Sequence, residues 1–326
     1  MLLAELLHLH YIYTYQEKYK MPDIMQAGDI AFPHLGIYIS DLPRGFYIGS
    51  FFIALYGAII AVGMILGISL ANHESNSLGH PKDFWWETGL WVMLFGVLGA
   101  RVYYVIFFWD HYKDNPIEIL DFRGGGLAIY GGVIAGFTTI YVCCRLKKLS
   151  YFKMLDVAIM GLLTGQIIGR WGNFTNREVF GGYTDNILAM RLPIEAVRSR
   201  DITDELMSHV TGSVNYIQVH PTFLYEGALN AVLLLIIWCY RRHKRFDGEL
   251  SLMYVGGYGI IRFFVEGIRT DQLKIGHTDI AVSQLLGITA FIFAVVCEVI
   301  VRVKLAGKKT AAAEEVKQPE DKEKEE

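Results

Sequence analysis

Seven apolar runs, each long enough to cross a lipid bilayer, constrain this chain more than any other feature of its sequence. A helix of about 20 apolar residues spans the hydrocarbon core. Of the 326 residues, 53% are hydrophobic and 19% are charged. The runs cover residues 47–70, 84–108, 126–145, 154–170, 223–240, 249–267 and 281–304. The sequence therefore predicts an all-α polytopic membrane protein with seven transmembrane helices.

Basic clusters orient the predicted spans, because such clusters stay on the cytoplasmic side. RLKK (Arg145–Lys148), RRHKR (Arg241–Arg245) and VRVKLAGKK follow the third, fifth and seventh spans. With these ends inside, the N-terminus lies outside, the C-terminus is cytoplasmic, and the loops 109–125, 171–222 and 268–280 lie outside. The net charge of −3 and the absence of a basic surface argue against a nucleic-acid partner.

Three regions flank or interrupt the span domain at 47–305. Residues 1–46 read as an interfacial arm, aromatic and basic at their start. Residues 171–222 hold a predicted helix, IEAVRSRDITDELMSHV, and a strand-like NYIQV, so they predict a small external cap between spans four and five. The tail at 306–326 mixes Lys and Glu with few apolar residues and is predicted to be disordered and cytoplasmic.

The stretch GRWGNFTNREVFGG, Gly169–Gly182, places polar side chains where the fourth span leaves the bilayer. Arg170 is a permanent cation with a planar fork of donors that suits a phosphate or carboxylate. Asn173 and Asn176 add neutral donors, and we expect Glu178 to hold Arg170 when no ligand is bound. A helix end with a snorkelling arginine is the alternative. The density of polar groups favours an anion site at a membrane surface.

A second charged stripe lies in the sixth span. Tyr258, Arg262 and Glu266 recur at intervals of four residues, and Arg269 follows three further on, so all four share one helix face. Arg262 and Glu266 can form an ion pair, which is the structural alternative to a binding role. Together with Arg170, Arg262 suggests a clamp of two arginines around an anion.

Three further segments carry candidates on the same predicted side. FRGGGLAIYGGVIAG contains Tyr130, either a ligand-facing hydroxyl or a packed ring. HPTFLYEG brings His220 to a helix start, where capping is as reasonable as catalysis. Arg101, in LGARVYYV, lies within a span and needs a partner that the sequence does not identify.

The four cysteines show neither a CxxC pair nor spacing typical of a metal site. All lie within predicted spans or at their inner ends, so we expect reduced thiols that pack against neighbours. The sequence predicts no metal and no organic cofactor.

These segments together resemble the bacterial prolipoprotein diacylglyceryl transferase family. The resemblance rests on GRWGNFTNREVFGG, LGARVYYV, GGGLAIYGGVIAG, HPTFLYEG and YGIIRFFVEGIRTD, which lie in the family's order over about residues 30–305. It implies a multi-pass enzyme of the bacterial plasma membrane with its active site toward the outer face. The implied partners are phosphatidylglycerol, preprolipoprotein signal peptides with a lipobox cysteine, and the bilayer.

The reaction that the resemblance implies moves the sn-1,2-diacylglyceryl group of phosphatidylglycerol to the lipobox thiol and releases glycerol phosphate. Negative charge grows on the departing phosphate, and fixed cations stabilise such charge. The resemblance marks Arg170 and Arg262 as catalytic. The predicted substrate-binding residues, some from the family pattern and some from the residues alone, are Tyr56, Arg101, Asn173, Asn176, Glu178, Gly181, Tyr258, Glu266 and Arg269.

One position departs from the family pattern, since Tyr130 stands where many members carry a histidine assigned as base. A phenol, with a pKa of about 10, is a poor base at neutral pH. Three readings stay open: an activated Tyr130, proton transfer to His220, or thiolate formation assisted by the arginines, which we favour. All four of Arg170, Arg262, Tyr130 and His220 are thus catalytic candidates.

Two other functions also use parts of this pattern. A transporter for an anionic lipid would need buried arginines and glycine-rich helices, but it often carries an internal repeat, which this sequence lacks. A phosphatidyl transferase would need an aspartate-rich metal motif, which is also missing from the sequence.

Overall fold

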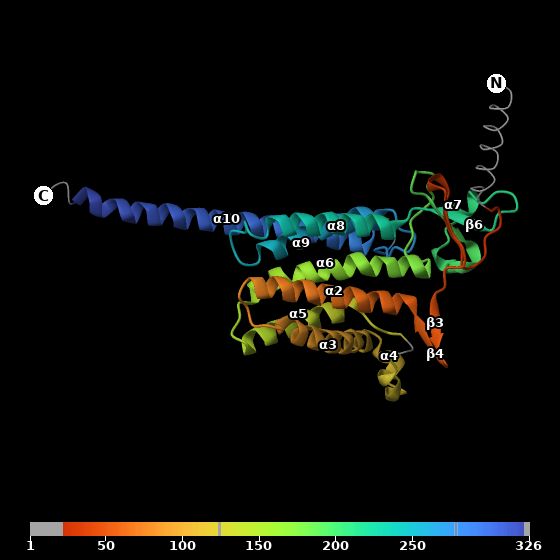
Figure 1. Ribbon diagram of the computed structural model, residues 1–326, viewed down its shortest axis with the longest axis horizontal. Helices are drawn as coiled ribbons and strands as arrows, with labels where there is room; N and C mark the ends of the chain where they lie inside the picture. Colours follow the sequence, from red (N-terminus) through yellow and green to blue (C-terminus); the bar gives the residue numbers. More distant parts are fainter. Residues whose placement is uncertain (1–21, 123–124, 277, 279, 323–326) are drawn as a thin grey trace, which may run out of the picture. The chain divides into compact units, whose positions relative to one another are not determined.

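A computed structural model describes residues 22–122, 125–276, 278 and 280–322, with side chains as far as residue 307 (Figure 1). The chain divides into two compact units. The first holds Gln166–Asn230, Gly259–Ile288 and the described residues up to Val62. The second holds Gly63–Gly165, Ala231–Tyr258 and the described residues from Thr289 onward. Residues 1–21 of the predicted arm lie outside the described residues.

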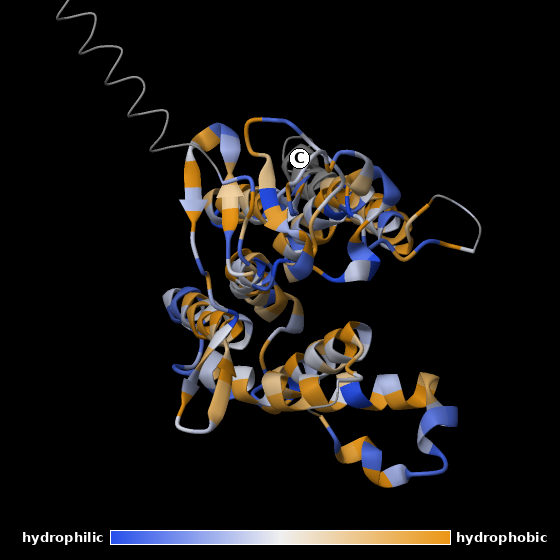
Figure 2. Cartoon of the chain, turned by 90° about the vertical axis from the view of Figure 1, so that its right-hand side faces the viewer, coloured by the Kyte–Doolittle hydropathy of each residue, from blue (hydrophilic) through white to orange (hydrophobic). Residues whose placement is uncertain are grey.

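Each predicted span coincides with a long helix whose residues are mostly apolar, shown in orange in Figure 2. The helices are α2 (Leu55–Ser77), α3 (Phe84–Phe107), α5 (Ile129–Leu146), α6 (Tyr151–Asn176), α8 (Thr222–Tyr240), α9 (Glu249–Gly267) and α10 (Val282–Lys322). Among the described residues, six helices are long and apolar enough to cross a membrane, and α9 is the long helix that is not. Charged side chains such as Arg262 and Glu266, with several glycines, lower the hydropathy of α9.

The expectation of a purely helical protein is wrong in the first unit, which contains a four-stranded antiparallel sheet of order β2-β1-β5-β6. Its strands are β1 (Ile30–Phe32), β2 (Ile37–Ile39), β5 (Met190–Pro193) and β6 (Tyr216–Val219). Part of the predicted N-terminal arm is therefore a pair of strands on the cap. Pairing satisfies its backbone groups and buries Ile30 and Phe32 in a core with Leu192, Ile217 and Val219.

The cap confirms the strand expected at NYIQV but corrects the helix expected over residues 194–210. That segment is broken into η3 (Ile194–Ala196), η4 (Ser199–Asp201) and α7 (Asp204–Ser208). Ile202 is extended between the last two. The hydroxyl of Thr203 then accepts from the backbone N–H of Leu206, at 3.2 Å, and starts a new helix.

The first predicted span begins later than expected, because residues 45–54 form a hairpin before α2. Its strands, β3 (Gly45–Ile48) and β4 (Phe51–Ala54), pair in register from Gly45 opposite Ala54 to Ile48 opposite Phe51. Gly49 has φ of 61° at the first position of the two-residue turn, a conformation that favours glycine. A glycine-containing turn between apolar runs thus separates a hairpin from the span.

Glycine contacts and buried ion pairs order the second unit. A Cβ on Gly161 of α6 would lie 2.6 Å from the carbonyl oxygen of Gly67 on α2, so both helices need glycine there. Asp156 accepts from Lys244 Nζ at 2.8 Å and from the backbone N–H of Gly248 and Ser251 at 2.9 Å. The prediction that Asp156 pairs with a basic residue is confirmed, and the same carboxylate caps α9.

The disorder predicted for the tail differs from the structure, in which α10 continues to Lys322. The run AAAEEVK has strong intrinsic helix formers, so backbone helix can extend beyond the apolar part of α10. The four cysteines are free thiols, as expected.

Candidate functional site

The end of α6 carries the first half of the candidate site. Arg170 and Asn173 are one turn apart, and Arg170 Nη1 donates to Asn173 Oδ1 at 3.3 Å. The helix ends at Asn176, after which Arg177 and Val179 adopt φ of 55° and 59° and turn the chain. Arg177 donates to the carbonyl oxygens of Gly28 and Leu42, which anchors this turn to the N-terminal segment. The polar stretch is thus held rigidly where the helix stops.

Glu226 of α8 joins the two arginines that the sequence singled out. Its Oε1 accepts from Arg170 Nη2 at 2.5 Å, and its Oε2 accepts from Arg262 Nη1 at 3.3 Å. The side chain of Glu226 is 1% exposed, and those of Arg170 and Arg262 are 18% and 17% exposed. A nearly buried carboxylate between two cations is stable only because both charges compensate it.

Glu226 corrects two expectations. Glu178 was expected to hold Arg170, but Glu226 does so, and Arg170 is paired in the protein interior rather than snorkelling to a helix end. Sequence reasoning noted Glu226 without giving it a role. The signal was present, since Glu226 is the one acidic residue in the apolar sequence of α8.

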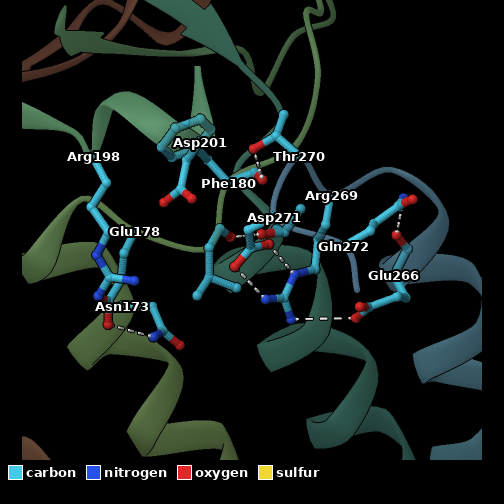
Figure 3. Close-up of polar contacts among 12 residues, drawn as sticks. Asn173, Glu178, Phe180, Arg198, Asp201, Glu266, Arg269, Thr270, Asp271 and Gln272 are labelled. Carbon is cyan, nitrogen blue, oxygen red and sulfur yellow. Dashed lines mark hydrogen bonds and ion pairs between the residues drawn. The ribbon is translucent and has the colours of Figure 1, made fainter. Parts of the chain in front are cut away.

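The charged stripe at the end of α9 continues from Arg262. The predicted pair is confirmed, with Arg262 Nη2 at 2.5 Å from Glu266 Oε2. Arg269 Nη1 lies 3.4 Å from the same oxygen. Arg269 also binds Asp271 with two hydrogen bonds, Nε to Oδ1 at 2.8 Å and Nη2 to Oδ2 at 2.7 Å (Figure 3). Burial opposes the charge on Asp271, but the hydrogen bonds and charge of Arg269 hold the pKa of Asp271 below its usual value.

On the other side of Arg170, the contacts run through Glu178 to the cap. Asn173 Nδ2 donates to Glu178 Oε1 at 3.1 Å, and Asn176 Nδ2 lies 3.5 Å from the same oxygen. The other oxygen, Oε2, is paired with Arg198 from the cap (Figure 3). Sequence reasoning missed Arg198, because nothing in its local sequence distinguishes it from the neighbouring arginine Arg200.

These contacts form one continuous row of alternating charges within the first unit, which we call the arginine row. In order, its members are Arg198, Glu178, Asn173, Arg170, Glu226, Arg262, Glu266, Arg269 and Asp271. Four guanidinium groups face four carboxylates. An anionic ligand can replace a carboxylate on the arginines without leaving a buried charge uncompensated, which suits the row to binding a phosphate.

Glycines bring Gly181, His220 and Tyr56 against this row. The backbone N–H groups of Gly181 and Gly182 donate to the carbonyl oxygens of His220 and Ile268, at 3.0 and 2.9 Å. A Cβ on Gly181 would lie 2.7 Å from the carbonyl oxygen of Ile268, so glycine alone permits this approach beside Arg269. Similarly, Gly172 of α6 leaves room for the ring of Tyr56, whose Cδ2 would lie 2.7 Å from a Cβ there.

His220 lies at the start of α8, as predicted, but its ring contacts a tyrosine. Its Nδ1 is 3.2 Å from the hydroxyl of Tyr225, and that oxygen also accepts from Asn186 Nδ2 at 3.0 Å. Burial lowers the pKa of His220, so the ring is neutral at neutral pH. The structure does not bring His220 into the arginine row by any contact among the described residues.

Arg101, Tyr130 and Tyr258 belong to the second unit. Arg101 is buried, and its guanidinium donates to the carbonyl oxygens of Glu118, Ile119, Gly125 and Gly126 at 2.6–3.1 Å. It therefore orders the loop that leads to α5. Tyr130 lies in the first turn of α5 with its side chain exposed and its ring centre 6.5 Å from that of Tyr103. The ring of Tyr258 stacks on Tyr254 at 5.5 Å.

Comparison with known proteins gives one consistent result. A family model described as prolipoprotein diacylglyceryl transferase matches residues 43–300. A phosphatidylglycerol–prolipoprotein diacylglyceryl transferase of Finegoldia magna is 41% identical over 249 residues, which cover 75% of this chain and 89% of that protein. The proteins of the same name from Limosilactobacillus reuteri and Clostridioides difficile are 38% and 37% identical and cover 82% and 73% of this chain, with 94% and 88% of their own lengths matched.

Proposed function

This chain belongs to the prolipoprotein diacylglyceryl transferase family, and from that membership we propose that it lipidates prolipoproteins at the plasma membrane of a bacterium. The donor is phosphatidylglycerol, and the acceptor is the lipobox cysteine of a preprolipoprotein. The cysteine sulfur attacks the sn-3 carbon of the diacylglyceryl group, and the bond from that carbon to the phosphate oxygen breaks. A thioether forms, glycerol phosphate leaves, and the thiol gives up its proton.

The sharing of Glu226 between Arg170 and Arg262 is the observation that supports this proposal most directly. The phosphate gains negative charge as the carbon–oxygen bond breaks. Two arginine forks already held side by side need no rearrangement to stabilise that charge, and this preorganisation lowers the barrier. Glu226 acts as the resting counter-ion, and the phosphate oxygens compete with it for the same N–H donors.

The remaining predicted residues take supporting roles in the proposal. Asn173 and Glu178 shape the phosphate site beside Arg170, while Glu266 and Arg269 hold Arg262 in place. The other proposed substrate-binding residues are Tyr56, Arg101, Asn176, Gly181 and Tyr258. Arg101 acts through the loop that it orders, because its donors bind backbone carbonyls.

The proton of the thiol leaves with the help of the arginines in the reading that we favour. A thiol has a pKa of about 8.5, and nearby cations lower it. Tyr130 would have to lose its own proton before it accepts another. His220 is neutral and can accept a proton, but its lowered pKa makes it a weak base. Both remain alternatives to arginine assistance.

For the membrane, we propose seven spans, with α9 as the seventh in addition to the six strongly apolar helices. The acidic and basic side chains of α9 pair with one another and with α8, which makes a membrane location acceptable. The basic clusters support an outside N-terminus, a cytoplasmic C-terminus, and an external cap and active site.

Purified protein tests this function directly. Vesicles that contain phosphatidylglycerol labelled in both glycerol groups are mixed with a lipobox peptide, and products are identified by mass spectrometry. We expect a thioether-linked diacylglyceryl peptide and one equivalent of labelled glycerol phosphate. A peptide with serine in place of the cysteine is the control. If the cysteine peptide stays unmodified while the protein is folded and the lipid accessible, the proposed function is wrong.

A further inference from the structure

The ion pair between Glu178 and Arg198 has no task in the chemistry proposed above. Arg198 extends from the cap, and its side chain is 52% exposed, whereas the other three arginines of the row are at most 18% exposed. The carboxylate of Glu178 is 11% exposed and is also held by Asn173 and Asn176. The pair thus combines a fixed acceptor with an accessible donor (Figure 3).

The pair lies one amide group away from Arg170, since Asn173 accepts from Arg170 and donates to Glu178. A phosphodiester bound by Arg170 carries two organic groups. The diacylglyceryl group is apolar and belongs in the membrane, so the other, polar group turns toward polar side chains. Glu178 and Arg198 are the charged residues that continue the row from Arg170 on the side of the cap.

From this arrangement, and on the basis of the proposed function, we infer that the Glu178–Arg198 pair selects the head group of the lipid donor. The hydroxyls of an uncharged polyol donate to Glu178 and accept from Arg198, so glycerol satisfies both partners. A cationic head group would approach Arg198, which repels it, and would find Glu178 already neutralised. Arg198 is therefore a specificity-determining residue.

Loss of the charge on Arg198 should change this preference in one direction. In Arg198→Gln, Glu178 keeps its two amide donors but loses its counter-ion, so it attracts an ammonium group. Initial rates of peptide lipidation are measured with vesicles of phosphatidylglycerol or phosphatidylethanolamine as the donor. We expect the preference for phosphatidylglycerol to fall by about tenfold, with the KM for phosphatidylglycerol increased and transfer from phosphatidylethanolamine increased, as expected for one gained charge contact at a partly buried carboxylate.

Two variants make this test specific. Arg198→Lys keeps the positive charge and should keep most of the preference. Arg191→Gln removes a cap arginine outside the row, whose guanidinium contacts Gln218 and the ring of Tyr216, and should keep the wild-type ratio. Arg198→Met supplies a second uncharged variant if Arg198→Gln does not fold.

The outcomes separate this inference from the proposed function. A wild-type protein that transfers no diacylglyceryl group from either lipid contradicts the proposed function. If the wild type is active and the uncharged Arg198 variants keep its lipid preference, the proposed function stands and the role of Arg198 is refuted.

Discussion

At the scale of single residues, the two guanidinium forks around Glu226 matter more than their charge alone. Arg170→Ala and Arg262→Ala should each lower the rate of thioether formation by roughly 10²–10³, the usual loss for one transition-state donor. Arg170→Lys and Arg262→Lys should recover only part of this, because an ammonium lacks the planar pair of donors. Arg191→Lys, in the cap but outside the row, is the control. Wild-type rates in both lysine variants of the row would show that charge suffices.

Tyr130→Phe tests the identity of the base. If arginines assist thiolate formation, the loss of activity should be modest and should shrink as the pH approaches the thiol pKa of about 8.5. A hydroxyl that acts as the base would instead contribute roughly 10²–10⁴ in rate. The measurement is the pH dependence of peptide lipidation. A folded Tyr130→Phe protein that binds phosphatidylglycerol but remains inactive even at about pH 9 would contradict our reading.

Asp201 offers a residue-scale test of stability. Its side chain is buried, and Oδ2 has no hydrogen-bond partner among the described residues. Burial raises the pKa of Asp201, and the negative charge of Asp271 raises it further. The folded protein therefore holds this proton more tightly than the unfolded chain. As the pH rises from the unfolded pKa of about 3.9 through the raised pKa, ionisation destabilises the fold.

Asp201→Asn removes this ionisation, so it should raise the free energy of unfolding near pH 8 by about 1 kcal/mol. The gain should disappear as the pH falls toward 4. Thermal unfolding of the purified protein at several pH values measures it. Asp185→Asn is the control, because the hydrogen bonds from His34 and Gln218 lower the pKa of Asp185, and its neutralisation should give no such gain. A melting temperature for Asp201→Asn that stays at or below that of the wild type at pH 8 would refute the argument.

At the scale of helices, three glycines of α6 share one spacing but not one environment. A Cβ on Gly161 would lie 2.6 Å from the carbonyl oxygen of Gly67, and one on Gly165 would lie 3.8 Å from that of Gly63. A Cβ on Gly169 would have no atom within 4 Å. The stripe predicted from the sequence is therefore a tight helix contact at its first member.

Gly161→Ala should destabilise the protein by roughly 1–3 kcal/mol, because two backbones must move apart. Gly165→Ala and Gly169→Ala should leave the melting temperature unchanged or slightly higher, since alanine favours the helix. The three melting temperatures, compared in one detergent, decide the point. Equal values across the series would mean that the Gly161–Gly67 approach does not limit packing.

At the scale of the whole molecule, orientation in the membrane is the property to test. Asp185→Cys in the cap should react with a membrane-impermeant maleimide added to intact cells, and Asp247→Cys, next to the basic cluster Arg241–Arg245, should react only after lysis. The expected contrast follows from the retention of basic clusters on the cytoplasmic side. The reverse pattern would invert the topology and remove the external placement of the site. The parent protein, labelled in parallel, controls for its four native cysteines.

Much of this protein could be inferred from local sequence. Apolar runs of bilayer length predicted the long helices, because a helix satisfies its own backbone within one segment. The spacing of Arg262 and Glu266 predicted their pair, since residues four apart share a helix face. The signature around Arg170 predicted a polar site, because charged groups beside apolar segments require a partner or a ligand.

Only the tertiary structure decided which groups meet. Glu226 reaches Arg170 across 56 positions of sequence, and Arg198 reaches Glu178 from the cap, so no local spacing encodes either pair. The strands at Ile30–Phe32 and Ile37–Ile39 likewise depend on a partner strand at Met190–Pro193, because a strand cannot satisfy its backbone alone. Helices follow from contacts a few residues apart, whereas the sheet and the arginine row follow from contacts that exist only after the chain has folded.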